Sequence, residues 1–209
     1  MCVTAKAPLS DWIEGGRTAL AGGGWVEARA CFEQALGWSA SAEAWDGLSW
    51  ACWWLEDGTA AIQAREHAYR LYKDAGERRA AARMAIWLAN DYLDFRGEAA
   101  VAQGWLRRAE RILDDLPTAP EHGWLAALQG QFALEAGELA EAVRIGARVR
   151  RLGRDLGITD LEMLGLVRAI RTLGEQPVRD ALTEGVRPLT TASGSVRFED
   201  EYRYLIATS

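Results

Sequence analysis

The chain has 209 residues, of which 49% are hydrophobic and 26% charged, values typical of a soluble globular protein with a core that needs no disulfides. Its formal net charge of −6 disfavours a nucleic-acid-binding surface, which requires clustered positive charge. No apolar run reaches the roughly 20 residues that cross a bilayer, and the first residues do not follow the pattern of a signal peptide.

Helix-forming residues fill the chain between recurring turn and breaker residues, and strand-like alternation is nearly absent. The segments between breakers are roughly 12 to 18 residues long, an ordinary length for a helix in a globular protein. In chain order the breakers occupy residues 22–24, 37–41, 57–58, 74–76, 96–97, 117–120, 137, 153–160 and 174–177. We therefore predict an all-α protein.

The first pair of helices, around residues 12–35, carries small and aromatic residues at tetratricopeptide-like positions. The small residues Gly16 and Ala28 let two antiparallel helices approach closely, and a glycine-rich turn separates the two helices. We expect Trp12 and Phe32 to fill the groove that this close approach creates.

Small residues recur in the later helix pairs, and the recurrence predicts a repeat. The corresponding alanines are 33, 41, 40 and 39 residues apart, which is longer and looser than the about 34 residues of an ideal tetratricopeptide repeat. These alanines are Ala28, Ala61, Ala102, Ala142 and Ala181. We expect a right-handed α-solenoid of about five helix pairs over residues 1–189, followed by a loop and a partial C-terminal helix over residues 190–209. A non-repeating helical bundle is the alternative.

Five short stretches carry a family resemblance: LEDG at 55–58, REHAYRLY at 65–72, IWLANDYLDFRG at 86–97, GWLRRA at 104–109 and PEHGWL at 120–125. They resemble the tetratricopeptide-like region of large LuxR-type (MalT-like) bacterial transcriptional regulators, and the resemblance covers most of residues 10–186. It implies a helical sensor or scaffold module. Such regulators also carry a helix-turn-helix, and some carry an ATPase-like domain. This sequence shows neither a helix-turn-helix nor a GxxxxGK[ST] phosphate loop, so the resemblance gives no support for DNA binding by this chain.

The ten tryptophans are the most unusual feature of the composition. On helical spacing Trp50 shares a face with Trp54, whereas the adjacent Trp53 and Trp54 point in different directions. One interpretation is an aromatic-lined concave face for a peptide or a small apolar molecule, because large aromatic side chains dominate binding surfaces. The other interpretation is packing between repeats. The predicted partner-binding residues are Trp50, Trp53, Trp54, Trp87, Asp91, Tyr92 and Trp124.

Two carboxylates adjoin this set. Asp91 and Asp94 are three residues apart and share a helix face beside Tyr92. Paired carboxylates either take part in acid–base chemistry or grip a cationic partner. The alternative is a solvated helix end before the turn at residues 96–97.

The sequence contains no recognisable metal-binding or nucleophilic motif. His67 and His122 are the only histidines and lie 55 residues apart, and HExxH, CxxC and GxSxG are all absent. We therefore predict no catalytic residue, no metal and no cofactor. Three cysteines without paired spacing favour a reducing, cytoplasmic setting.

These observations favour a binding module whose partner is a peptide, a protein or a small apolar ligand, with no nucleic-acid or membrane contact by this chain. An enzyme or biosynthetic accessory protein that uses the same concavity as a reaction chamber is the alternative. The incomplete last helix predicts either a frayed end or a homodimer that covers it.

Overall fold

The computed structural model describes residues 9–158, apart from the side chain of Leu139, and every regular element in this part is an α-helix. The all-α class is therefore confirmed, and none of these helices combines the length and apolarity needed to span a membrane. The eight helices are α1 (Leu9–Ala21), α2 (Trp25–Leu36), α3 (Ala42–Trp54), α4 (Gly58–Asp74), α5 (Arg78–Arg96), α6 (Ala99–Leu113), α7 (Pro120–Glu135) and α8 (Leu139–Leu156). The predicted fifth pair and the segment 190–209 lie outside the described residues.

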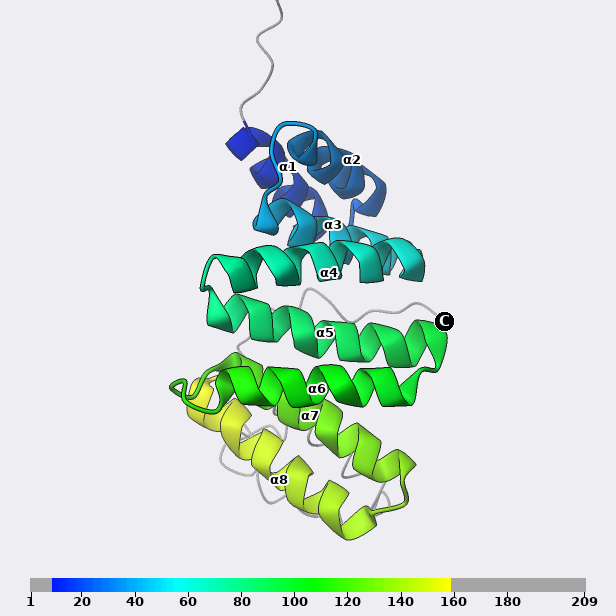
Figure 1. Ribbon diagram of the computed structural model, residues 1–209, viewed down its shortest axis with the longest axis vertical. Coiled ribbons are helices and arrows are strands. Elements are labelled where there is room, and N and C mark those ends of the chain that lie inside the picture. Colours follow the sequence, from blue (N-terminus) through cyan, green and yellow to red (C-terminus); the bar gives the residue numbers. More distant parts are fainter. Residues whose placement is uncertain (1–8, 159–209) are drawn as a thin grey trace, which may run out of the picture.

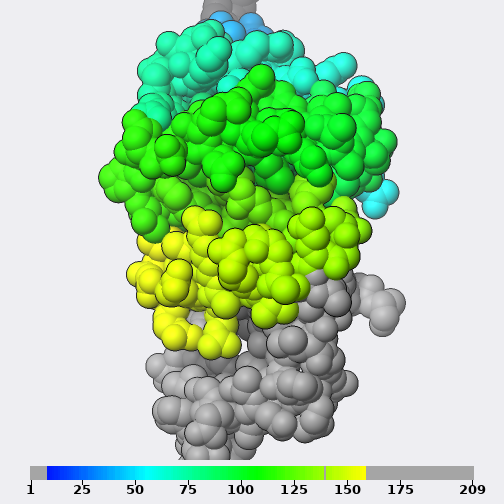
Figure 2. Space-filling view, turned by 60° about the horizontal axis from the view of Figure 1, so that its bottom comes forward, coloured from blue at the N-terminus to red at the C-terminus, as the bar shows by residue number. Residues whose placement is uncertain are grey.

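The helices follow one another along the long axis of the molecule in the order of the chain (Figure 1). The helices from α1 to α6 pack chiefly against their neighbours in the chain, and contacts also join α1 to α3. Helix α7 packs chiefly against α8 and contacts both α5 and α6. On the face drawn in Figure 2, successive helices form successive bands of surface from cyan through green to yellow. The arrangement thus has a stacking order and no single common centre.

The second helix of each pair begins in the same way. Its fourth residue is a buried alanine whose N–H donates to the backbone carbonyl four residues earlier, over 2.8 to 3.0 Å. The four alanines, all at most 7% exposed, are Ala28, Ala61, Ala102 and Ala142. A small side chain at this position lets the two helices of a pair approach closely, as the sequence predicts. Ala181 lies outside the described residues.

The turn within each pair also repeats. Five residues before each of these alanines, the chain adopts a left-handed backbone conformation, with φ between 58° and 77°. Three of the four residues are glycine, namely Gly23, Gly97 and Gly137, and the fourth is Glu56. Glycine adopts this conformation without steric cost, whereas a side chain with a Cβ does not. The turn between α3 and α4 is therefore the strained version of a common turn.

The buried side chains form three clusters along the stack, which lie at α1–α4, α4–α7 and α7–α8. Trp45 packs against the first two clusters and Trp124 against the last two, so these tryptophans join the clusters into one column. Within the first cluster Phe32 is fully buried between Gly16 and Gly47. A Cβ on either glycine would lie 2.6 Å or 2.2 Å from the ring, so only glycine fits at these two positions.

Candidate functional site

Six tryptophans form one continuous series of ring contacts, which we call the tryptophan row. Along the row, neighbouring ring centroids are 4.7, 4.9, 6.2, 5.0 and 5.5 Å apart, within the range of favourable aromatic pairs. The row begins on α2, continues over α3 and α5, and ends on α7. In order its members are Trp25, Trp54, Trp53, Trp50, Trp87 and Trp124.

Equal spacing in the sequence builds the central part of this row. Trp50, Trp87 and Trp124 are 37 residues apart, and they lie on α3, α5 and α7. All three are partly buried, so each ring packs against the core and still reaches the surface. The structure therefore brings together five of the seven predicted partner-binding residues, and it adds Trp25 to them.

The adjacent residues Trp53 and Trp54 lie perpendicular to each other, with ring centroids 4.9 Å apart, and have different surroundings. Trp53 packs against the first core cluster, whereas Trp54 is 46% exposed and stacks on Trp25 with an interplanar angle of 9°. Sequence reasoning missed Trp25 because it begins the preceding helix, and helical spacing within α3 does not reveal a partner on another helix. One end of the row is thus an exposed aromatic pair.

A buried ion pair lies beside the middle of the row. The Nε atom of Arg65 on α4 is 3.0 Å from an Oδ2 atom of Asp91 on α5, and both side chains are 0% exposed. The Arg65 guanidinium carbon lies 4.5 Å from the Trp50 ring centroid and 5.7 Å from that of Trp87. A desolvated arginine over two indole rings is a strong cation–π arrangement. The pair therefore fixes the two rings where the row crosses from α3 to α5.

The hydrogen bonding of this pair is incomplete. Although the Nε–Oδ2 distance is short, the two groups are not aligned for a hydrogen bond. The other Arg65 nitrogens and Asp91 oxygen have no hydrogen-bond partner among residues 9–158. Burial raises the pKa of Asp91 to about 6, against the opposing effect of the Arg65 charge. Burial likewise lowers the pKa of Arg65, which the Asp91 charge partly offsets. The desolvation cost of such a pair is comparable to its electrostatic attraction. The pair therefore adds little to the stability of the fold, and its main effect is to hold the rings of Trp50 and Trp87 in place.

The expectation that Asp91 lies on a solvated helix end is wrong, because Asp91 is fully buried and faces α4. Its neighbour Asp94 instead accepts a hydrogen bond of 2.8 Å from the Asn90 amide. Tyr92 donates to Glu66 Oε1 over 3.0 Å on the α4 side and, within the described part of the chain, has no ring contact with the tryptophan row. Asp91 and Tyr92 thus connect α5 to α4 and are not part of the tryptophan row.

Sequence reasoning also missed Arg65, which is the largest fully buried side chain in the described part of the protein. The signal was present in the spacing. Arg65 lies four residues after Ala61 and three before Ala68, on the stripe of α4 that faces the core. A charged residue on an apolar stripe predicts a buried partner.

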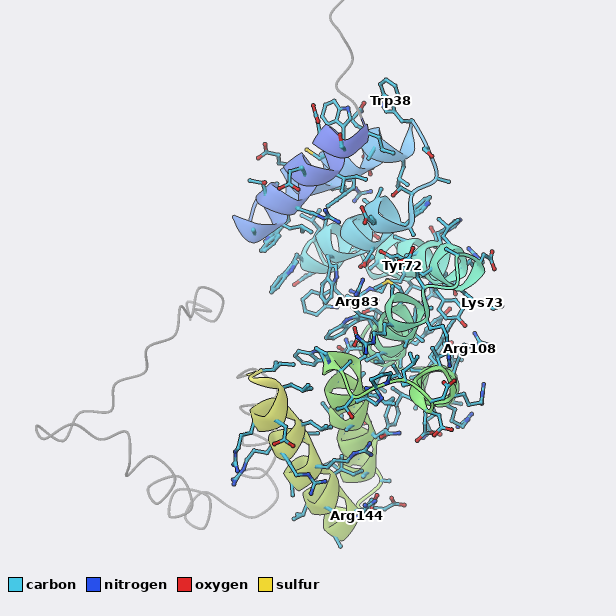
Figure 3. The ribbon with its side chains drawn as sticks, turned by 90° about the vertical axis from the view of Figure 1, so that its left-hand side faces the viewer. Trp38, Tyr72, Lys73, Arg83, Arg108 and Arg144 are labelled. Atoms are coloured by element: carbon cyan, nitrogen blue, oxygen red, sulfur yellow. The ribbon has the colours of Figure 1, made fainter. Side chains whose placement is uncertain are left out.

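A groove adjoins the row at Trp50. It has a volume of about 490 Å³, is open to solvent, and lies among α1, α3 and α5 with the end of α4. Its polar lining comes from Arg17, Glu43, Asp46, Tyr72, Glu77 and Arg83. Tyr72 and Arg83 lie close to each other where α4 meets α5 (Figure 3).

The charges of this groove are arranged in pairs. Arg83 lies 2.7 Å from Asp46, which also accepts a hydrogen bond of 3.4 Å from Tyr72, and Arg17 lies 3.3 Å from Glu43. Burial, reinforced by the Asp46 charge, raises the pKa of Tyr72 well above its usual range. Asp46 and Arg83 lie one helical turn before Trp50 and Trp87 on the same two helices. The ion pair Asp46–Arg83 therefore lies next to the ring contact Trp50–Trp87.

The arrangement supplies contact area, fixed rings and paired charges, which are the elements of a binding surface. Within residues 9–158, no three histidine, cysteine or acidic side chains converge in a way that would hold a metal ion. Comparisons of the chain with protein-family models, with curated proteins and with solved structures gave no match.

Proposed function

We propose that the protein is a peptide-binding module of the tetratricopeptide kind, built as a right-handed α-solenoid. The contacts between successive helices, the shared turn and the recurring buried alanine all support a stack of equivalent helix pairs. The resemblance to the helical region of LuxR-type regulators supports a sensor or scaffold role. In this proposal the peptide lies along the tryptophan row and enters the adjoining groove.

The observation that carries this proposal is the continuity of the row. Six indole rings in contact cross α2, α3, α5 and α7, and one of them, Trp54, is 46% exposed. Tryptophan supplies a large contact area at a small entropic cost and is enriched among residues that dominate binding energy. Because the rings are held by the core and by Arg65, little freedom is lost when a partner binds.

The character of the groove favours a peptide over a small apolar molecule. A small apolar ligand requires an enclosed and mostly apolar cavity, whereas this groove is open and is lined by the ion pairs Asp46–Arg83 and Arg17–Glu43. A peptide offers backbone donors and acceptors to the ion pair Asp46–Arg83 and apolar side chains to the rings of Trp50 and Trp87.

The test is to select peptides from a random displayed library on the full chain and to measure one selected peptide by fluorescence anisotropy. Trp54→Ala is expected to weaken its binding at least tenfold, the loss typical of a residue that dominates an interface. Trp38→Ala is the matched control, because Trp38 is 45% exposed and lies in the loop between α2 and α3. Equal losses in the two variants, with intact helicity, would refute the proposal.

A further inference from the structure

A second pocket has a lining whose charges are all positive. It has a volume of about 270 Å³ and lies where the end of α4, the start of α5 and the end of α6 meet. Its lining consists of Lys73, Arg78, Ala81, Arg108, Arg111 and Ile112. No acidic side chain of residues 9–158 lines it, although the whole chain has a net charge of −6. We call it the cationic pocket.

The cationic pocket and the groove lie on different sides of the molecule. In Figure 3, Lys73 and Arg108 lie near each other on the right-hand side, whereas Arg83, which lines the groove, lies to the left of them. The two sites share no lining residue. A ligand in the cationic pocket would therefore leave the tryptophan row free.

Two of the four cations are held in place before any ligand binds. The guanidinium carbon of Arg108 lies 4.5 Å from the Trp105 ring centroid and 5.7 Å from that of Tyr69. Arg78 donates to Asp115 Oδ2 over 2.9 Å and to the Ile112 carbonyl over 2.8 Å. Cations that are already oriented lose less conformational freedom when they bind an anion.

The positive charge of the pocket is largely uncompensated. Arg78 pairs with Asp115, whereas Lys73, Arg108 and Arg111 make no ion pair within residues 9–158. The groove between α6, α7 and α8 shows the contrast, because its arginines share their lining with acidic residues and Arg144 pairs with Glu141 over 2.5 Å. The cationic pocket is thus not a mere consequence of the arginine-rich composition.

The start of α5 adds to the same potential. Arg78 and Ala81 are the first and fourth residues of α5, and the N-cap residue Glu77 makes no side-chain hydrogen bond to the helix. The first N–H groups of a helix carry a partial positive charge that favours anions. This contribution only supplements the four side-chain charges.

We propose that the cationic pocket binds the phosphate groups of a small phosphorylated molecule. A carboxylate would neutralise one of three uncompensated cations, whereas a phosphate or diphosphate offers more charge and more acceptor oxygens to the guanidinium forks. The proposal is independent of the peptide-binding function. It assigns the pocket a ligand of its own on the opposite side of the helix stack.

The test is calorimetric titration of the full chain with inorganic pyrophosphate at low ionic strength. Arg111→Gln and Lys73→Gln are each expected to weaken binding about tenfold, the loss of one charge-assisted contact. Arg107→Gln is the matched control, because Arg107 is an exposed arginine of the same helix that lines a different groove. It is expected to stay within about twofold of the unmodified chain, and Trp54→Ala to leave pyrophosphate binding unchanged, since exposed charges away from the site contribute little.

Three outcomes would overturn the proposal. The unmodified chain would release or absorb no heat of binding, or Arg107→Gln would weaken binding as much as Arg111→Gln, which would indicate diffuse attraction. In a parallel titration, a phosphoserine peptide that bound much more tightly than pyrophosphate would overturn the assignment to a small molecule. Helicity measured by circular dichroism confirms that each variant is folded.

Discussion

Two arginines of this protein lie over aromatic rings at the same distances, but one is buried and the other is exposed. Arg65 lies 4.5 Å and 5.7 Å from the centroids of Trp50 and Trp87, and Arg108 lies 4.5 Å and 5.7 Å from those of Trp105 and Tyr69. Arg65 is fully buried, however, while Arg108 is exposed.

Burial explains the difference between their partners. A guanidinium removed from water needs an opposite charge, and Asp91 supplies it to Arg65. Arg108 keeps its hydration and has no carboxylate partner in the part of the chain that the structure describes. The same stacking thus fixes the tryptophan row on one side of the molecule and presents a charge to an anion on the other.

The largest expected effect comes from breaking the buried pair on one side only. Arg65→Met leaves the Asp91 carboxylate buried without a partner, and we expect it to lower the free energy of unfolding at pH 7 by about 3 to 5 kcal/mol. The double variant Arg65→Met with Asp91→Leu is expected to recover most of that loss, since an apolar pair of similar volume carries no desolvation cost. Denaturant unfolding measures both.

Arg108→Met is the control for this experiment, because it removes an arginine from equivalent rings at the surface. We expect it to change the free energy of unfolding by less than about 1 kcal/mol. A loss for Arg108→Met as large as that for Arg65→Met would show that stacking, and not burial, sets the energetics of both arginines.

The pH dependence of stability is the next effect in size. The pKa of Asp91 is raised by burial to about 6 in the folded protein, above the 3.8 of a free side chain. Between these two values the folded state binds more protons than the unfolded state, so stability falls as pH rises. The contribution of Asp91 is fully present below pH 3.8 and is lost by about pH 6, with an upper limit of about 3 kcal/mol.

The double variant isolates this contribution, because it lacks the pair and keeps every other carboxylate. We expect its free energy of unfolding, measured from pH 3.8 to pH 6 by denaturant titration, to lack the part of the decline that comes from Asp91. Parallel pH profiles for the double variant and the unmodified chain would contradict the assignment.

The smallest expected effect concerns the turn that joins the helices of Trp50 and Arg65. Glu56 occupies a left-handed position with φ 58° that is glycine in the other three pairs. Glu56→Gly is expected to raise the free energy of unfolding by about 1 kcal/mol, since it removes the steric cost of the side chain. Thermal unfolding measures it, and Gly97→Ala, with the opposite change, is expected to lower stability by a similar amount. A neutral Glu56→Gly would show that this turn carries no strain.

Local signals in the sequence account for the helices. The breakers at 22–24 and 37–41 fall in the gaps between helices, and the four described alanines at the corresponding positions are all buried. The breaker segments 57–58 and 117–120 are only partly turns, because Gly58 and Pro120 are each the first residue of a helix. Gly58 in addition makes room for Phe95, whose ring would lie 2.4 Å from a Cβ at that position.

The interior of the site was less predictable, because its contacts join residues far apart in the chain. Arg65 and Asp91 belong to different helices, and periodicity places each of them on a face without naming what that face meets. The same reason explains the error over Asp91, which looks like part of a polar helix end until α4 covers it. The tryptophans were recognisable from their number, but their order in the row depends on how the pairs stack.

The tryptophan row has an optical consequence. Indole rings about 5 Å apart exchange excitation energy before they emit. Excitation energy absorbed by any ring of the row is therefore transferred to the ring of lowest excited-state energy. A ring in water emits at longer wavelength than one in an apolar interior, which makes the half-exposed Trp54 the natural end of that transfer. The emission of the row is thus weighted towards one indole, and a partner that covers Trp54 would shift that part of the spectrum without any added dye.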